Sequence, residues 1–112
     1  MNIEKPSREA QVYLQQLLRD LEAIRREAAN AVNAVLAQEQ FRKWKKQAIA
    51  SLEEKIGVAS TQQLAQAWLH TAYPGGDLYE ELADDIEMCI RHVKKLLKTL
   101  ESQGISKSTP PS

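Results

Sequence analysis

The sequence predicts an all-α fold, an uneven bundle of four helices. Apolar residues recur at steps of three and four along most of the chain, which is the period of an amphipathic helix. Residues 7–56 contain no glycine or proline, and the four glycines and four prolines lie at the predicted breaks or in the tail. We therefore expect helices over about residues 7–36, 40–56, 61–72 and 78–102.

The first predicted helix begins at Ser7, whose side chain can cap the first turn after Pro6. Glu9 stands in that turn, where the helix dipole favours a carboxylate. One stripe of apolar residues follows: Leu14, Leu17, Leu18, Leu21, Ile24, Ala28, Val32, Val35 and Leu36. This spacing predicts that one face of the helix is buried.

The apolar stripe shifts by one residue just before Phe41, where it restarts. Its later members are Phe41, Trp44, Ala48, Leu52 and Ile56. A one-residue shift turns the apolar face by about 100°, and a single helix over residues 7–56 would be about 75 Å long. We therefore expect a break at residues 35–40, with Asn30 and Asn33 as alternative break sites because asparagine tolerates left-handed backbone. A continuous helix would instead require a coiled-coil dimer.

The other predicted helices carry capping residues at their ends. Gly57 would end the second helix in the left-handed conformation, and Ser60 would cap the third. The third helix ends before the loop at residues 73–76, and Asp77 would cap the last helix. An unbroken stripe predicts this last helix: Leu78, Leu82, Ile86, Cys89, Ile90, Val93, Leu96, Leu97 and Leu100. Gly104 would terminate it.

Composition indicates one helical domain over residues 1–104, with residues 105–112 as a disordered tail or the start of a linker. Fifteen basic and fifteen acidic residues cancel, so no global field attracts nucleic acid or a membrane surface. No apolar run approaches the roughly 18 residues of a membrane span, and the N-terminus lacks the apolar core of a secretory signal. The single cysteine, Cys89, is predicted to be a buried, inert thiol. We expect a cytoplasmic protein.

The charges of the second and fourth predicted helices run in opposite orders along the chain. The fourth begins with acids and ends with bases, in keeping with the helix dipole, whereas the second begins with bases and ends with Glu53 and Glu54. In an up-down-up-down bundle these two helices are parallel. The basic start of one would then face the acidic start of the other, and we predict that this pairing fixes topology or association.

Eight residues form the candidate interaction surface: Phe41, Arg42, Lys43, Trp44, Lys45, Lys46, Trp68 and Tyr73. Cations next to aromatic rings are also typical of nucleic-acid contacts, because cations neutralise phosphates and rings stack on bases. Phe41 and Trp44 lie three residues apart on one helix face, however, and the net charge is zero. The pattern therefore favours rings that face the core between solvated charges. The aromatic residues would anchor a core edge, or an interface with a protein partner or a second copy in a homodimer.

One acidic motif bears on catalysis. Glu80-Glu81-Leu82-Ala83-Asp84-Asp85 resembles half of the acidic motif of helical MazG-like nucleotide pyrophosphatases. This resemblance implies a magnesium-dependent enzyme whose carboxylates converge from two helices. The other half would need a third acid after paired glutamates, and Glu53-Glu54 is followed by Gly57 instead. Capping and solvation are the favoured explanation of these acids, and we expect no catalytic residue, metal or cofactor.

Two further resemblances concern interaction. The segments Trp68-Leu69-His70-Thr71 and Tyr79-Glu80-Glu81-Leu82 resemble part of the helical RbcX-type Rubisco assembly chaperones. Residues 18–100, with the segments 41–48, 52–57 and 95–100, resemble helical modules at the N-termini of bacterial multidomain signalling or defence proteins. The second resemblance implies a non-catalytic sensor or adaptor. The sequence therefore predicts a helical protein-interaction module, with the pyrophosphatase and the chaperone as alternatives.

Overall fold

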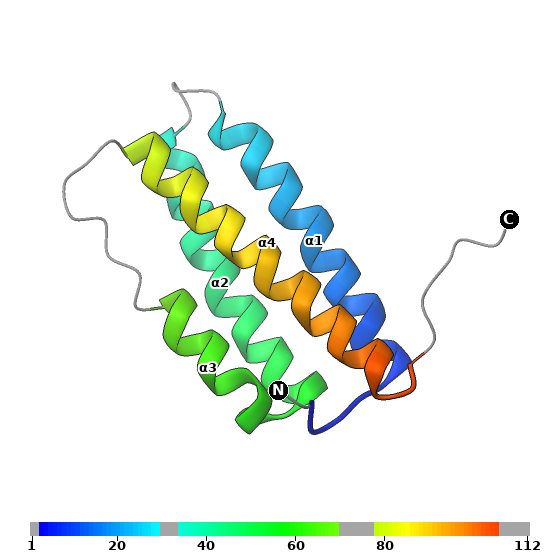
Figure 1. Cartoon of the computed structure of the whole chain (residues 1–112). Helices are drawn as coiled ribbons and strands as arrows, with labels where there is room; N and C mark the ends of the chain where they lie inside the picture. The colour runs from blue at the N-terminus through cyan, green and yellow to red at the C-terminus, as the bar shows by residue number, and fades with distance from the viewer. Residues whose placement is uncertain (1–2, 30–33, 70–77, 106–112) are drawn as a thin grey trace, which may run out of the picture.

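The computed structural model describes residues 3–29, 34–69 and 78–105, and within them it contains four α-helices and no strand. The helices are α1 (Arg8–Ala28), α2 (Ala34–Ile56), α3 (Val58–Leu69) and α4 (Leu78–Ser102). Successive helices alternate in direction, so α2 and α4 run parallel to each other and antiparallel to α1 and α3 (Figure 1). This arrangement confirms the predicted all-α four-helix bundle.

The core of the bundle lies where α1, α2 and α4 meet, and α3 packs mainly against α2. The largest fully buried side chains come from all four helices: Trp68, Phe41, Leu14, Leu17, Leu21, Leu52, Ile56, Leu82, Ile86 and Leu100. The bundle is uneven, as predicted, because α3 has 12 residues and α2 has 23. At 1.5 Å per residue, α3 is about 18 Å long and can cover only half of α2.

α1 begins as predicted and ends earlier. The Ser7 hydroxyl accepts a hydrogen bond from the backbone N–H of Ala10 at 3.0 Å. The predicted end at residue 36 is wrong, because α1 ends at Ala28 and the N–H of Ala29 donates to the carbonyl of Arg25. The stretch of residues 7–56 therefore contains two helices, α1 and α2 (Ala34–Ile56), rather than one continuous rod.

α2 begins at Ala34, so the predicted break at residues 35–40 is also wrong. The reason is that Ala37 is fully buried and extends the α2 stripe back by one turn from Phe41. Val35 and Leu36, which the sequence assigned to the first stripe, are 64% and 53% exposed. The alternative break sites, Asn30 and Asn33, lie between the two helices and outside the described residues.

The connection between α2 and α3 is shorter than predicted, because one residue rather than four separates the two helices. Gly57 ends α2 at a φ of 104°, in the left-handed region as expected, and α3 begins at the next residue. Ser60 is therefore not the N-cap but lies within the first turn of α3. Its N–H donates to Oε1 of Glu4 at 3.1 Å, and its hydroxyl accepts from the N–H of Glu4 at 2.8 Å. Residues 70–72 of the predicted helix lie outside the described residues.

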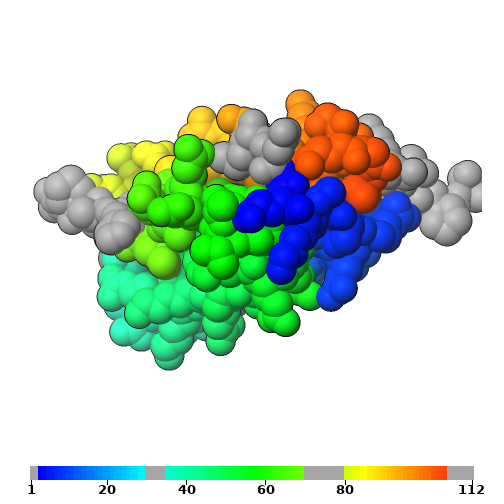
Figure 2. Space-filling view, turned by 90° about the horizontal axis from the view of Figure 1, so that it is seen from below, coloured from blue at the N-terminus to red at the C-terminus, as the bar shows by residue number. Residues whose placement is uncertain are grey.

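An N-terminal segment, residues 3–5, crosses the end of the bundle between the α2–α3 corner and the end of α4 (Figure 2). Ile3 is buried, and its backbone exchanges two hydrogen bonds with the side chain of Gln103 at 2.8 and 2.9 Å. The N–H of Lys5 donates to the carbonyl of Ile56 at 3.2 Å. This segment therefore ties the beginning of the chain to three helix ends.

α4 has the predicted bounds, 78–102, and Gly104 follows it at a φ of 98°. Ile105, which the sequence assigned to the tail, packs partly buried against the core. Residues 106–112 and the predicted cap Asp77 lie outside the described residues. None of the described helices is long and apolar enough to cross a bilayer.

Candidate functional site

Five of the eight residues of the predicted interaction surface line one pocket between α2 and the C-terminal end of α3. The pocket has a volume of about 300 Å³, and its lining residues are Gln38, Phe41, Arg42, Lys45, Lys46, Trp68 and Leu69. The α2 residues recur at steps of three and four, so they share one side of the helix. The α3 residues are the last two of that helix. The pocket therefore forms where α3 ends against the middle of α2.

Two aromatic rings line the base of the pocket, and a third ring packs against both of them. Phe41 and Trp68 are buried, and Trp44 is half-buried and stacks on both. Its ring centroid lies 5.9 Å from that of Phe41 and 5.5 Å from that of Trp68. The Trp44 indole N–H also donates to Oδ2 of Asp20 on α1 at 3.2 Å. The prediction that these rings face the core is confirmed, and the base of the pocket is held by several packed contacts.

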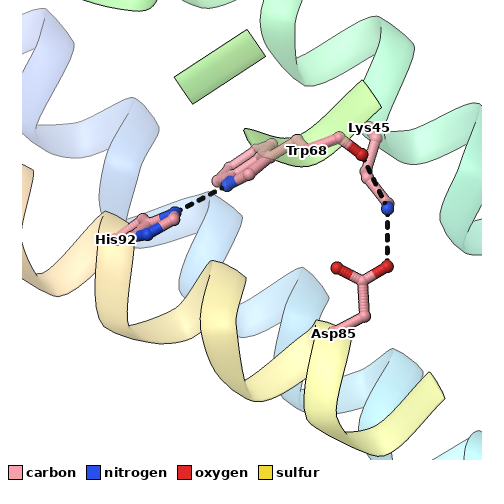
Figure 3. Close-up of polar contacts among 4 residues, drawn as sticks. All are labelled: Lys45, Trp68, Asp85 and His92. Carbon is pink, nitrogen blue, oxygen red and sulfur yellow. Dashed lines mark hydrogen bonds and ion pairs between the residues drawn. The ribbon is translucent and has the colours of Figure 1, made fainter. Parts of the chain in front are cut away.

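Lys45 is buried, so the prediction that the charges between these rings are solvated is wrong at this residue. Its Nζ donates to Oδ2 of Asp85 on α4 at 2.6 Å and to the carbonyl of Trp68 at 2.9 Å (Figure 3). The same atom lies 4.6 Å from the centroid of the Phe41 ring. These contacts compensate for the desolvation of the charges, which costs several kcal/mol per ion. Lys45 therefore joins α2, α3 and α4.

The Lys45–Asp85 pair also agrees with the charge order predicted for the parallel helices. Lys45 belongs to the basic run in the middle of α2, and Asp85 belongs to the acidic first half of α4. Glu87 of α4 forms a second ion pair, with Arg25 of α1 rather than with α2. Lys55 at the end of α2 pairs with Glu9 of α1. Opposite charges thus link all three central helices.

Trp68 is fixed by its ring as well as by its backbone. The indole Nε1–H donates to Nδ1 of His92 on α4 at 3.0 Å (Figure 3). An imidazole nitrogen accepts a hydrogen bond only when it carries no proton, so this contact needs neutral His92. Burial, followed by the charges of Arg91 and Lys95, lowers the pKa of His92 and favours that neutral form.

The exposed part of the pocket is formed by cations and one apolar residue. Arg42 and Lys46 are exposed on α2, and Leu69 is 44% exposed at the end of α3. Lys43 is exposed as well, but it does not line the pocket. Tyr73, the eighth predicted residue, lies outside the described residues.

Gln38 and Leu69 are pocket residues that the sequence interpretation missed. Helical spacing contained the signal for Gln38, because it lies one turn before Arg42. Leu69 follows Trp68 directly, and only the position of the end of α3 against α2 places it in the pocket.

The acids of the pyrophosphatase-like motif have different surroundings. Asp85 is buried against Lys45, whereas Glu80 and Asp84 are exposed. The described residues contain no group of three or more histidine, cysteine or acidic side chains placed to hold a metal ion. Cys89 is buried as predicted, and burial raises the pKa of its thiol, which keeps it protonated.

Comparison with known proteins finds no match to this chain among protein-family models, curated proteins or solved structures. The resemblances to adaptor modules, assembly chaperones and pyrophosphatases therefore stay predictions.

Proposed function

We propose that this chain is a non-catalytic protein-interaction module that binds its partner over one face of α2 and the end of α3. The α2–α3 face consists of Val35, Gln38, Arg42, Lys46 and Leu69, and the exposed Glu39 lies at its border, outside the pocket lining. The observation that carries the proposal is the pocket of about 300 Å³ on this face, in which exposed cations and a half-exposed leucine lie over buried aromatic rings. A preorganised apolar base with a charged rim is typical of protein interfaces.

Exposed apolar side chains support this choice of surface. Leu69 lines the pocket, and Val35 lies one turn before Gln38 on the same side of α2. Burial of Val35 and Leu69 by a partner would add a hydrophobic contribution to binding.

A protein partner fits this face better than a nucleic acid does. Binding of single strands uses aromatic rings on which bases stack, and the Phe41 and Trp68 rings are buried. The charge of Lys45 is already balanced by Asp85, so two pocket cations remain at the surface. The chain also carries no net charge that would attract a polyanion.

Affinity capture with charge-reversed baits tests the proposal. The wild-type chain, an Arg42→Glu/Lys46→Glu double variant and a Lys43→Glu control serve as baits, and quantitative mass spectrometry identifies the retained proteins. We expect a defined set of proteins to bind the wild type and the control but not the double variant. Circular dichroism checks that all three baits are equally helical. Retention of the same proteins by all three baits would contradict the proposal.

A further inference from the structure

We infer that the occupant of the α2–α3 face is an acidic amphipathic helix of about three turns, presented by a protein partner. This inference rests on the proposed function and adds the chemistry of the partner. Its first support is charge, because the pocket lining contains three cations and no acid. Asp85 balances Lys45 inside the protein, which leaves Arg42 and Lys46 for carboxylates of the partner.

The spacing of the two cations favours a helical partner. Arg42 and Lys46 are four residues apart on α2, so their Cβ atoms lie about 6 Å from each other. Two carboxylates four residues apart on a partner helix have the same separation. Such a helix, packed alongside α2, can therefore place one carboxylate near each cation.

Two exposed apolar residues of the α2–α3 face favour a partner helix that has an apolar side. Val35 is 64% exposed at the start of α2, and Leu69 is 44% exposed at the end of α3. A partner helix with leucines at steps of three and four would cover both residues with its apolar side. Its acidic residues would then flank that side and face Arg42 and Lys46.

The length of the face sets the length of the partner helix. Val35 and Lys46 are separated by about 17 Å along α2, at 1.5 Å per residue. This distance corresponds to about three turns. A segment of this size also agrees with the helix-in-groove mode of recognition, in which a few anchors one turn apart supply most of the contacts.

Fluorescence anisotropy with a dye-labelled synthetic peptide tests the inference. The probe is a helical peptide of about 12 residues, with leucines along one side and glutamates flanking them. One control peptide carries lysines in place of the glutamates. We expect saturable binding of the acidic peptide to the wild type and, within about twofold, to Lys43→Glu. Affinity should fall at least about tenfold, or 1.4 kcal/mol, in Arg42→Glu/Lys46→Glu, and the lysine peptide should not bind.

Three results would overturn the inference. The first is an equal loss of peptide affinity in Lys43→Glu, which would indicate unspecific attraction. The second is tighter, pocket-dependent binding of a single-stranded oligothymidylate, and the third is a concentration-dependent dimer by light scattering that the double variant abolishes. If the acidic peptide fails while captured proteins still depend on Arg42 and Lys46, the inference fails and the proposed function stands. If no captured protein depends on them either, the proposed function fails as well.

Discussion

Within the run of residues 41–46, neighbouring side chains have different environments. Lys45 is 6% exposed and bonded to Asp85 and to the carbonyl of Trp68, whereas Arg42 and Lys46 are exposed. Successive residues of a helix are turned by about 100°, so a run of four cations cannot share one environment. The ammonium of Lys45 therefore joins three helices, while Arg42 and Lys46 remain exposed to solvent.

Replacement of Lys45 by methionine tests the structural role of the buried pair. The substitution leaves the Asp85 carboxylate buried without its ammonium group, so we expect the free energy of unfolding to fall by about 3–5 kcal/mol. A Lys45→Met/Asp85→Leu double variant should recover most of that loss, because an apolar pair needs no compensation for desolvation. Lys43→Met, at an exposed position, should change stability by less than about 0.5 kcal/mol. Urea unfolding followed by tryptophan fluorescence measures all four proteins.

Two results would contradict this role of the Lys45–Asp85 pair. If Lys45→Met and Lys43→Met unfold at the same urea concentration, the buried pair contributes no stability. Failure of the double variant to recover would instead show that the ammonium acts mainly through the Trp68 carbonyl and the Phe41 ring.

The lowered pKa of His92 should make the stability of the fold depend on pH. Burial and two nearby cations lower the pKa of His92 in the folded chain, so the unfolded chain binds its proton more tightly. The contribution of neutral His92 to the free energy of unfolding is therefore fully present above the unfolded pKa of about 6.5. It is lost as the pH drops from there toward the lower folded pKa. His92→Gln removes this titration. We expect the wild type to lose more stability than His92→Gln between neutral and mildly acidic pH.

Urea unfolding at several pH values measures this difference, and subtraction of the two curves cancels the carboxylates and the second histidine, His70. Parallel curves would contradict the role assigned to His92. An NMR titration of the His92 ring should give a pKa below its usual value, and the indole N–H resonance of Trp68 should move over the same pH range.

At the scale of the elements, helix ends are set by contacts as well as by local signals. Gly57 and Gly104 both have a positive φ and end helices as the sequence predicts. Ser60 has the residue type of an N-cap but does not serve as one, because Glu4 reaches the first turn of α3 from the N-terminal segment. The start of α2 depends in the same way on Ala37, which is small enough to be fully buried.

The two glycines allow backbone strain to be separated from steric contact. A Cβ at Gly104 would meet no atom within 4 Å, so Gly104→Ala should cost about 1–2 kcal/mol from its left-handed backbone alone. A Cβ at Gly57 would lie within 2.4–2.8 Å of the Glu4 side chain and would displace it from Ser60. We expect Gly57→Ala to cost at least about 1 kcal/mol more, through the lost hydrogen bonds. Equal losses in thermal unfolding would show that Glu4 moves aside freely.

At the scale of the whole molecule, the N-terminal segment and α3 complete a bundle whose centre is α1, α2 and α4. Residues 3–5 bond to Ile56, Ser60 and Gln103, which are distant in the sequence. This segment has no helical period, so its sequence alone indicates no structural role. The contacts nevertheless place the first described residue, Ile3, in the core.

Substitution of Ile3 tests whether this segment belongs to the cooperative fold. Ile3→Ala leaves a cavity at the end of the bundle, and we expect a loss of about 2 kcal/mol, the lower end for buried apolar residues because the segment can partly collapse. Val12→Ala, at an exposed position of α1, is the matched control and should stay within about 0.5 kcal/mol of the wild type. Hydrogen exchange should also accelerate at the end of α4, where Gln103 bonds to Ile3. Unchanged stability and exchange would show that the segment only rests on the bundle.

The sequence by itself determined the helical class, the number of helices, the bounds of α4 and the glycine ends, because periodicity and capping are local properties. It also predicted that Phe41 and Trp44 face the core. Only the tertiary structure decided which cation is buried, since that depends on Asp85 and the Trp68 carbonyl approaching from other helices. The tertiary structure also determines the position of the pocket, because its lining residues meet only where the end of α3 packs against α2. The exposed cations of the charged run lie at the rim of this pocket, and the buried one holds the helices that position them.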